Sequence, residues 1–356
     1  MGAFFLLVSI QTGVSRCSLI GIPRSDEFHN LVEALREGKP VSRRAREGVF
    51  FVSAMNPRSA TLFRRLLLAA AVASALAGCA VLDSKQRQWI FQPVRDDWRG
   101  FAGTPRGTRE FWLDVATGAA SDARAEGQDA IHAWWMAHED PAAPVILYLH
   151  GSRWNLTGSS YRIERWRAMG FTVLAIDYRG FGKSSGDLPS EAMTYADARV
   201  AWNWLKTAAP DPGRRFIYGH SLGGAVAIDL AASLPAGEAA GLITEATFTS
   251  IADIVASSQW GFLPVGPLLT QRFESMDKVA RISLPKLFIH GTGDRIVPHP
   301  MSDRLFAAAA EPKQLLKVDG GGHSNIAWSG FDGYRQAIGE FVRTAQARLH
   351  DTHATR

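Results

Sequence analysis

Between residues 105 and 349, short apolar runs alternate with longer segments in which apolar side chains recur every three or four positions. Short apolar runs are typical of buried strands, and the longer periodic segments are typical of helices that cover a sheet. The predicted strands are 111–115, 131–136, 145–149, 172–177, 215–219, 241–245, 286–290 and 314–318. The predicted helices are 159–168, 191–207, 222–233, 300–310 and 332–349. This alternation predicts an α/β fold with a mostly parallel central sheet flanked by helices, and no second domain.

A different pattern occupies the residues before Cys79. Arg64 and Arg65 precede an apolar run of about a dozen residues that ends in small side chains at Cys79. The run is shorter than the roughly 20 residues needed to cross a bilayer, so the layout is typical of a signal peptide. The sequence Leu-Ala-Gly-Cys that ends at Cys79 resembles a bacterial lipoprotein signal, which implies cleavage before Cys79 and a lipid on its sulfur. An ordinary signal peptide and an uncleaved anchor are the alternatives.

This signal divides the chain and predicts its location. Since a signal peptide begins a chain, Met55 is interpreted as the true start and residues 1–54 as an upstream extension, with a genuine N-terminal extension as the alternative. By the same resemblance, Ala80 after the lipid-bearing cysteine implies attachment to the outer membrane, facing the periplasm. The predicted segments are a signal peptide at 55–78, an irregular polar spacer at 79–104, one domain at 105–349 and a tail at 350–356.

Charge and cysteine content support this division. The net charge is +5, but residues 1–78 carry ten of the 39 Lys and Arg and five of the 34 Asp and Glu, which leaves 29 of each. A neutral remainder gives no support for nucleic-acid binding. Once the leader with Cys17 is removed, Cys79 has no partner for a disulfide, so burial of apolar side chains must hold the domain. A chain over 79–356 is long enough for that.

The most informative motif follows the predicted strand 215–219. The sequence reads Gly-His-Ser-Leu-Gly over residues 219–223, and the predicted helix 222–233 follows at once. An abrupt strand-to-helix turn crowds its backbone, which glycine tolerates because it has no β-carbon. We therefore expect Ser221 to stand out from the sheet with an exposed hydroxyl, a candidate nucleophile at the positive end of a helix. A tight structural turn is the alternative.

A serine hydroxyl needs a base to take its proton, and the base needs an acid to orient it. Asp294 follows the predicted strand 286–290 in a glycine turn, and His323 follows the strand 314–318 and three glycines. Both positions lie just past the carboxyl end of a strand, where open α/β sheets build their sites. The chain order Ser221, Asp294, His323 predicts a nucleophile, an acid and a base.

An acyl-transfer site also needs two backbone N–H groups for the oxyanion. Leu222, directly after the candidate nucleophile, supplies one candidate. The strand 145–149 leads into His150 and Gly151, and the amide of Ser152 is the second candidate. His150 itself is interpreted as a buried structural histidine.

The sequence gives little support for another catalytic acid, a metal site or a cofactor site. Asp177 and Glu245 also lie near strand ends, but each is interpreted as a side chain that braces a loop, with a backup acid as the weaker alternative. No His, Cys or carboxylate cluster has the spacing of metal ligands, and no cofactor is expected.

The motifs together resemble the α/β-hydrolases, near the branch of lysophospholipase-like and depalmitoylating serine hydrolases. They are found at 149–151, 176–184, 219–224, 289–294 and 322–323. The resemblance implies an α/β-hydrolase fold and cleavage of a small-molecule or lipid-like carboxylic ester or thioester through an acyl-enzyme. An acyltransferase, an aminopeptidase-type peptidase and a non-catalytic binding lipoprotein are the alternatives. Arg153 and Trp154 depart from the pattern, which has small residues after His-Gly.

The segment between the strands 241–245 and 286–290 is a short lid insertion at about 249–285. It contains an apolar stretch broken by glycine and proline. Trp260, Phe262 and Leu263 are predicted to form an apolar wall for an acyl group. A buried lid helix packed on the core is the alternative.

Overall fold

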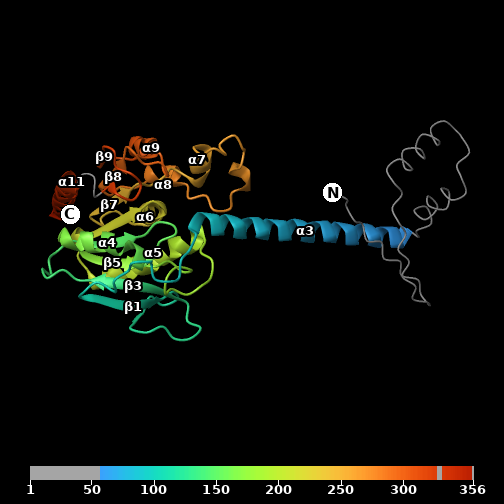
Figure 1. Ribbon diagram of the computed structural model, residues 1–356, viewed down its shortest axis with the longest axis horizontal. Helices are drawn as coiled ribbons and strands as arrows, with labels where there is room; N and C mark the ends of the chain where they lie inside the picture. Colours follow the sequence, from blue (N-terminus) through green and yellow to red (C-terminus); the bar gives the residue numbers. More distant parts are fainter. Residues whose placement is uncertain (1–56, 327–330, 355–356) are drawn as a thin grey trace, which may run out of the picture. The chain divides into compact units, whose positions relative to one another are not determined.

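The computed structural model describes residues 57–326 and 331–354, and the chain divides into two units, Met1–Ala77 and Gly78–Arg356. The expectation for residues 1–54 lies outside the described residues. Within the second unit the order of strands and helices follows the alternation read from the sequence (Figure 1).

A nine-stranded sheet runs through the second unit in the order β2-β1-β3-β5-β4-β6-β7-β8-β9. Neighbouring strands from β5 to β9 are parallel, whereas β1 pairs with β2 and β3, and β3 with β5, in antiparallel fashion. The strands are β1 (Thr108–Asp114), β2 (Ala120–Ser121), β3 (Ala130–Met136), β4 (Val145–Leu149), β5 (Thr172–Ile176), β6 (Arg215–His220), β7 (Gly241–Glu245), β8 (Lys286–Gly291) and β9 (Lys313–Val318). The predicted fold class, a mostly parallel sheet flanked by helices, is confirmed. The two-residue strand β2 had no signal in the sequence.

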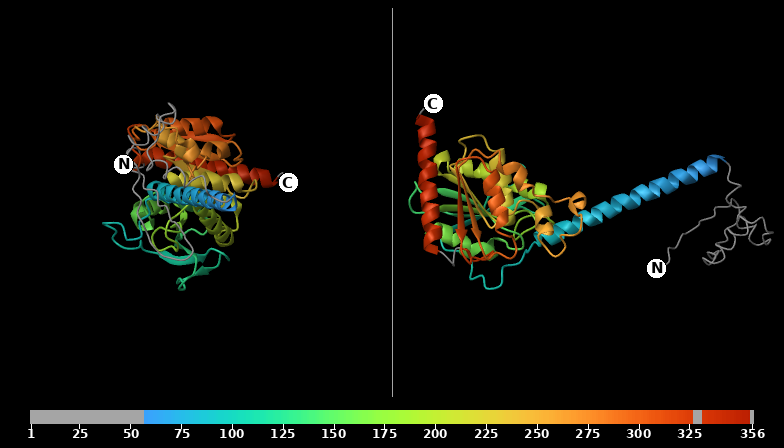
Figure 2. Two further views of the ribbon diagram at one scale, coloured as in Figure 1. Left: turned by 90° about the vertical axis from the view of Figure 1, so that its right-hand side faces the viewer. Right: turned by 90° about the horizontal axis from the view of Figure 1, so that it is seen from above.

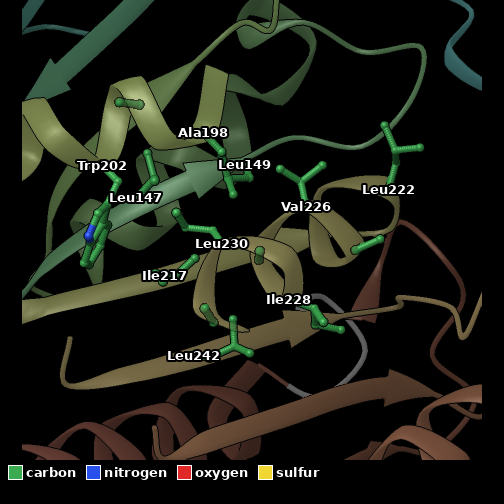
Figure 3. Packing of buried hydrophobic residues seen from close by; sticks show 14 of the residues in the cluster. Leu147, Leu149, Ala198, Trp202, Ile217, Leu222, Val226, Ile228, Leu230 and Leu242 are labelled. Carbon is green, nitrogen blue, oxygen red and sulfur yellow. The ribbon is translucent and has the colours of Figure 1, made fainter. Parts of the chain in front are cut away.

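Helices cover both faces of the sheet because each central strand is apolar on both sides. In β4, Leu147 and Leu149 pack in one cluster while Ile146 and Tyr148 pack in the other, as the alternation of side chains in a strand requires. Helices α5 (Glu191–Ala208), α6 (Leu222–Ser233) and α9 (Pro300–Ala308) contribute to the first cluster, part of which Figure 3 shows. Helices α4 (Leu156–Ala168) and α11 (Phe331–Ala354) contribute to the second, and α11 lies along one side of the sheet in the right-hand view of Figure 2.

The segment expected as an irregular spacer begins as a helix. Helix α3 spans Pro57–Phe91, so residues 79–91 are helical and only the residues beyond Phe91 match the expectation. The last turns are helical because they are rich in helix formers, and because Ile90 and Phe91 are buried in the domain core. Arg87 donates to the carbonyls of Leu188 and Pro189, which fixes this end of the helix to the domain. The segment is therefore part of the packed fold.

The insertion between β7 and β8 contains α7 (Ile251–Ala256), the 3₁₀ turn η2 (Gly266–Leu268) and α8 (Ser275–Val279). Ser250 caps α7 by accepting a hydrogen bond from the Asp253 amide. These helices are too short to leave a periodic signal, so the sequence indicated the insertion without its helices. A further short turn, η1 (Pro212–Arg214), precedes β6.

The order of the strands reverses its direction at β4. The chain passes from β4 outward to β5, and then returns to the other side of β4 with β6. In folds of this type, ligands bind at the carboxyl ends of the strands beside such a reversal. Ser152 follows β4 and Ser221 follows β6, so two of the predicted site residues lie at this reversal.

Candidate active site

Ser221 occupies a strained turn between β6 and α6. Its backbone has φ 54° and ψ −119°, a conformation that costs a non-glycine residue about 1–3 kcal/mol. The turn is held because the Ser221 amide donates to the Glu245 carbonyl at 2.8 Å and the Thr247 hydroxyl donates to the Ser221 carbonyl at 2.9 Å. A structure that stores strain at one serine and holds it from both sides is typical of a nucleophile elbow.

Glycine is required on both sides of this turn by close backbone contact. A β-carbon on Gly223 would lie 2.1 Å from the carbonyl oxygen of Leu149, and one on Gly219 would lie 2.1 Å from that of Gly223. Ser221 was expected to stand clear of the sheet, but it exposes only 7% of its surface. The expectation was wrong because the loop after β4 packs against it: a β-carbon on Gly151 would lie 3.3 Å from the Ser221 Cβ.

The structure brings the three predicted side chains together. His323 Nε2 lies 3.0 Å from Ser221 Oγ, and His323 Nδ1 lies 2.8 Å from Asp294 Oδ2. A carboxylate only accepts hydrogen bonds, so Nδ1 carries the hydrogen and Nε2 offers its lone pair to the serine hydroxyl. This tautomer is the one that a base needs in order to take a proton from Ser221.

Asp294 is held as a carboxylate. Burial alone would raise the pKa of Asp294, but hydrogen bonds from His290 and His323 outweigh it and hold that pKa well below the usual 3.8. Oδ1 also accepts hydrogen bonds from the amides of Ile296 and Val297. His290, which the sequence did not suggest, lies with Nε2 3.2 Å from Asp294 Oδ2 and 2.9 Å from the Val297 carbonyl. The fixed negative charge stabilises a protonated His323.

Two buried side chains hold the main chain that carries His323. His220 Nε2 lies 2.9 Å from the His323 carbonyl, and Arg162 Nη2 lies 2.7 Å from the carbonyl of Ser324. Burial lowers the pKa of His220 well below its usual 6.5, so its ring is neutral and donates through Nε2. The imidazole of His323 is therefore positioned through its own backbone as well as through its ring.

Arg162 belongs to a buried polar cluster that the sequence analysis missed. Its Nη1 pairs with Glu245 Oε1 at 2.6 Å, and the hydroxyls of Tyr218 and Tyr334 donate to Oε2 at 3.0 and 2.7 Å. Glu245 thus braces this part of the fold, as its favoured interpretation held. The available signal was an arginine on the buried face of α4, next to Ile163 and one turn before Trp166.

The two predicted oxyanion-hole amides have no hydrogen-bond acceptor within the described part of the chain. No described carbonyl or side chain accepts a hydrogen bond from the N–H of Ser152 or of Leu222, the two residues predicted to form the oxyanion hole. The loop that carries Ser152 is tied down elsewhere, since Arg153, at φ 71°, donates its amide to the Phe91 carbonyl. The Arg153 guanidinium binds Gln92 Oε1 at 2.9 Å, so this departure from the family pattern anchors the loop to the end of α3.

The three apolar lid residues predicted to contact an acyl group are exposed. Trp260, Phe262 and Leu263 expose 55%, 75% and 42% of their surface. This exposure contradicts the alternative of a lid helix buried on the core, whereas the apolar wall for an acyl group stays a prediction.

The remaining polar candidates brace loops. Asp177 accepts a hydrogen bond from the Leu156 amide and lies 3.0 Å from Nδ1 of the buried His132. His150 is fully buried, with Nδ1 2.7 Å from the Gly151 carbonyl, as expected of a structural histidine. Among the described residues no group of three or more His, Cys, Asp or Glu side chains is placed to hold a metal ion.

Comparison with known proteins identifies the family. The family described as serine aminopeptidase, S33, matches residues 140–276. The uncharacterized protein Rv2307c of Mycobacterium tuberculosis is 36% identical over 211 residues, which cover 58% of this chain and 73% of that protein. The α/β-hydrolase GrgF from Penicillium has 16% identity and a TM-score of 0.53 over 68% of this chain and all of its own, which shows the same fold.

The chain belongs to the α/β-hydrolase family.

A further relative of this α/β-hydrolase carries a specific name. The lysophosphatidylserine lipase ABHD12 of Danio rerio is 32% identical over 221 residues. The match covers 57% of this chain and 56% of that protein, so the chain spans about half the length of this relative. The activity class of the present protein is that of a hydrolase.

Proposed function

We propose that this α/β-hydrolase cleaves carboxylic esters or thioesters by transfer of the acyl group from substrate to Ser221 and then to water. The observation that carries the proposal is His323, whose two ring nitrogens contact Ser221 Oγ and Asp294 Oδ2. The name of the lysophosphatidylserine lipase relative favours an acyl ester of a lipid-like molecule as the substrate class.

The reaction follows from the roles of these groups. His323 Nε2 takes the hydroxyl proton as Ser221 Oγ attacks the carbonyl carbon, and the amides of Ser152 and Leu222 hold the negative oxygen. The imidazolium, stabilised by Asp294, then protonates the leaving alcohol or thiol. Water attacks the acyl-serine, His323 takes its proton, and the acid is released with Ser221 restored.

A fluorophosphonate probe tests this proposal, because it phosphonylates an activated serine and leaves an ordinary one alone. We expect labelling of the wild-type chain at Ser221 and hydrolysis of a p-nitrophenyl ester. Ser221→Ala should abolish labelling and lower the rate by roughly 10⁴–10⁶. Ser233→Ala, at the far end of the same helix, should change neither. Near wild-type hydrolysis by Ser221→Ala would refute the assignment.

The description of the matching family favours one second candidate, an aminopeptidase. Hydrolysis of a panel of aminoacyl amides, at rates that match or exceed those for esters, would support it. An added alcohol or lysolipid that captures the acyl group would instead indicate an acyltransferase, whereas a wild-type chain that resists the probe would indicate a binding protein.

We also propose attachment to the bacterial envelope through the segment before the domain. Cys79 is exposed within α3, and the part of that helix from Arg65 to Phe91 is long and apolar enough to cross a membrane. A signal sequence gives the same pattern. Mass spectrometry of the mature protein separates the two: a lipid-modified N-terminus at Cys79 supports the lipoprotein interpretation, whereas recovery of residues 57–78 supports an uncleaved anchor. Recovery of any peptide from residues 1–54 would refute the interpretation that the chain starts at Met55.

A further inference from the structure

Large apolar side chains are exposed together on the lid and on the last turns of α3. Trp260, Phe262, Leu263 and Leu268 of the lid are 42–75% exposed, and Trp260 and Phe262 lie with ring centroids 6.5 Å apart. Leu82 and Trp89 of α3 are 39% and 60% exposed. Leu82 lies four residues before Gln86 and Trp89 three residues after it, so the two share the side of the helix on which Gln86 lies. We call these six residues the lid face.

Hydrogen bonds join the two parts of the lid face. Gln86 Nε2 donates to the Leu268 carbonyl at 2.7 Å, and Gln86 Oε1 accepts from the Thr270 amide at 2.8 Å. Gln271 Nε2 donates to Asp83 Oδ1 at 2.9 Å. The lid lies beside this end of α3 in both views of the molecule from the side and from above (Figures 1 and 2). The exposed side chains therefore belong to one surface, built from segments far apart in the sequence.

This surface adjoins segments that carry no charge. The lid has no Asp, Glu, Lys or Arg from 254 to 271, and α3 has none from 66 to 82. A monomeric protein rarely exposes such an apolar surface unless it meets a partner there. The partner must accept an apolar, aromatic-rich face that continues along the chain into a helix long and apolar enough to cross a membrane. A lipid bilayer meets both conditions, since tryptophan concentrates at the membrane interface.

The lid face is also connected to the candidate active site. The lid leaves the sheet at the end of β7, where the Glu245 carbonyl accepts from the Ser221 amide. At the C-terminal end of α3, two residues after Trp89, the Phe91 carbonyl accepts from the Arg153 amide in the loop that carries Ser152. The lid therefore follows shortly after the strand that holds the elbow, and α3 ends at the residue that holds the oxyanion loop.

We propose that the lid face rests in the interfacial layer of a lipid bilayer, so that the edge of the sheet with Ser221 lies against the membrane from which an acyl ester is drawn. The docking does not depend on the catalytic role of Ser221. The inference that the substrate comes from the membrane rests on the function proposed above. Either mode of attachment, an uncleaved helix or a lipid on Cys79, places the start of the docked segment at the bilayer.

Quenching of tryptophan fluorescence by brominated lipid tests the docking directly. No tryptophan precedes Trp89, so insertion of residues 65–88 gives no signal of its own, and Trp260 on the lid reports docking independently of α3. Full-length protein is reconstituted in phosphatidylcholine vesicles with and without bromine on the acyl chains. We expect quenching in the wild type, a clear part of it lost in W260F and more in W89F/W260F, and all of it retained in W112F, where Trp112 lies on β1 in the antiparallel part of the sheet. Equal quenching in W260F and the wild type would overturn the proposal and would indicate that the lid face binds a protein partner instead.

A kinetic measurement tests the consequence for substrate. In the variant W89D/L268D, a charge replaces an apolar side chain on each part of the lid face. We expect KM for a vesicle-borne ester to rise about tenfold or more, the change expected when one leucine-sized group is no longer buried, with kcat and KM for a water-soluble p-nitrophenyl ester unchanged. An unchanged KM for the vesicle-borne ester would overturn the substrate route. Absence of all ester hydrolysis in the wild type would refute the proposed function while the quenching result stands.

Discussion

At the scale of single residues, His323 is aligned through four contacts. Ser221 and Asp294 contact its ring nitrogens, while His220 and Arg162 hold the carbonyls of residues 323 and 324. A base displaced by about 1 Å loses much of its rate advantage, because catalysis depends on the approach of reacting atoms. The buried Arg162 therefore acts as a positioning residue, and its pairing with Glu245 keeps its charge compensated.

Arg162→Met should lower the free energy of unfolding by about 3–5 kcal/mol, because Glu245 is left as a buried and unpaired charge. Arg162 and Glu245 are only 6% and 1% exposed, so water cannot replace the lost partner. Urea denaturation followed by circular dichroism measures the change. A loss below about 1 kcal/mol would contradict the assignment of a tightly coupled buried pair.

Arg162→Met combined with Glu245→Gln separates stability from positioning. We expect most of the lost stability to return, since a neutral amide still accepts from Tyr218 and Tyr334. The rate of ester hydrolysis should remain lower by roughly tenfold to a hundredfold, because only the longer hydrogen bond from the Tyr161 hydroxyl, at 3.4 Å, then holds the Ser324 carbonyl. A double variant with wild-type kcat would show that Arg162 has only a structural role.

At this scale the sequence predicted the residues that follow strands in a recognisable order. It missed the residues that are important because they contact a distant part of the chain. Ser221, Asp294 and His323 each follow a strand, so their convergence at one edge of the sheet could be deduced. His220 and Arg162 touch the His323 loop across more than a hundred positions of sequence. Nothing in the sequence states which carbonyl a buried arginine will reach.

At the scale of elements, the β6–α6 turn depends on the contact between Gly223 and β4. Gly223→Ala places a methyl group 2.1 Å from the Leu149 carbonyl oxygen and 2.5 Å from that of His150, neither of which is free to move. We expect α6 to shift, ester hydrolysis to fall by at least a hundredfold and the melting temperature to drop. Differential scanning calorimetry and p-nitrophenyl ester assays measure both effects.

Gly339→Ala is the matched control for that substitution. Gly339 lies within α11, and its new methyl group would meet only Arg343 Nη1, at 3.5 Å. Alanine is the better helix former, so stability should rise by about 0.5–1 kcal/mol with no change in activity. Equal effects of the two substitutions would contradict the role given to the Gly223 contact.

The elements predicted from the sequence were those with a strong apolar pattern. Each predicted strand corresponds to one of β1 and β3–β9, and the helices differ mainly at their ends. Helix α3 was misjudged after Cys79, because Asp83 to Gln88 read as a polar linker until Ile90 and Phe91 are seen in the core. The short helices α7 and α8 depend on capping and on contacts with the domain, which no periodicity records.

At the scale of the whole molecule, a chain of polar contacts fastens the antiparallel edge to the centre of the sheet. On β3, His132 lies with Nδ1 3.0 Å from Asp177 Oδ2, at the end of β5, and with Nε2 2.7 Å from Glu110 Oε1 on β1. Lys183 also contacts Glu110. Hydrogen bonding from His132 and Lys183 lowers the pKa of Glu110 from its ordinary 4.5 to about 2 despite partial burial. Burial lowers the pKa of His132, but hydrogen bonds to Asp177 and Glu110 outweigh it and raise that pKa above 6.5.

These shifts predict how acid unfolds the protein. A carboxyl with a lower pKa in the folded chain binds fewer protons there than in the unfolded chain, so protons favour unfolding. The contribution of Glu110 is present above pH 4.5 and is lost as the pH falls from 4.5 to about 2. Glu110→Gln should therefore show a flatter fall in the free energy of unfolding over this interval. The pKa of Asp294 is also lowered, but Asp294 is present in both the wild type and the variant, so its contribution to the pH dependence cancels in the comparison.

The same substitution changes the opposite side of the pH profile. The stabilisation that His132 gains from its partners is present below pH 6.5 and is lost as the pH rises through its raised pKa. Glu110→Gln removes one of the two carboxylates that raise this pKa, so the fall in stability above pH 6.5 should also become shallower. Urea denaturation from pH 2 to 9 measures both limbs. Parallel curves for the two proteins would show that the edge strands contribute nothing to the pH dependence, whereas flattening on both limbs identifies one linked charge network across β1, β3 and β5.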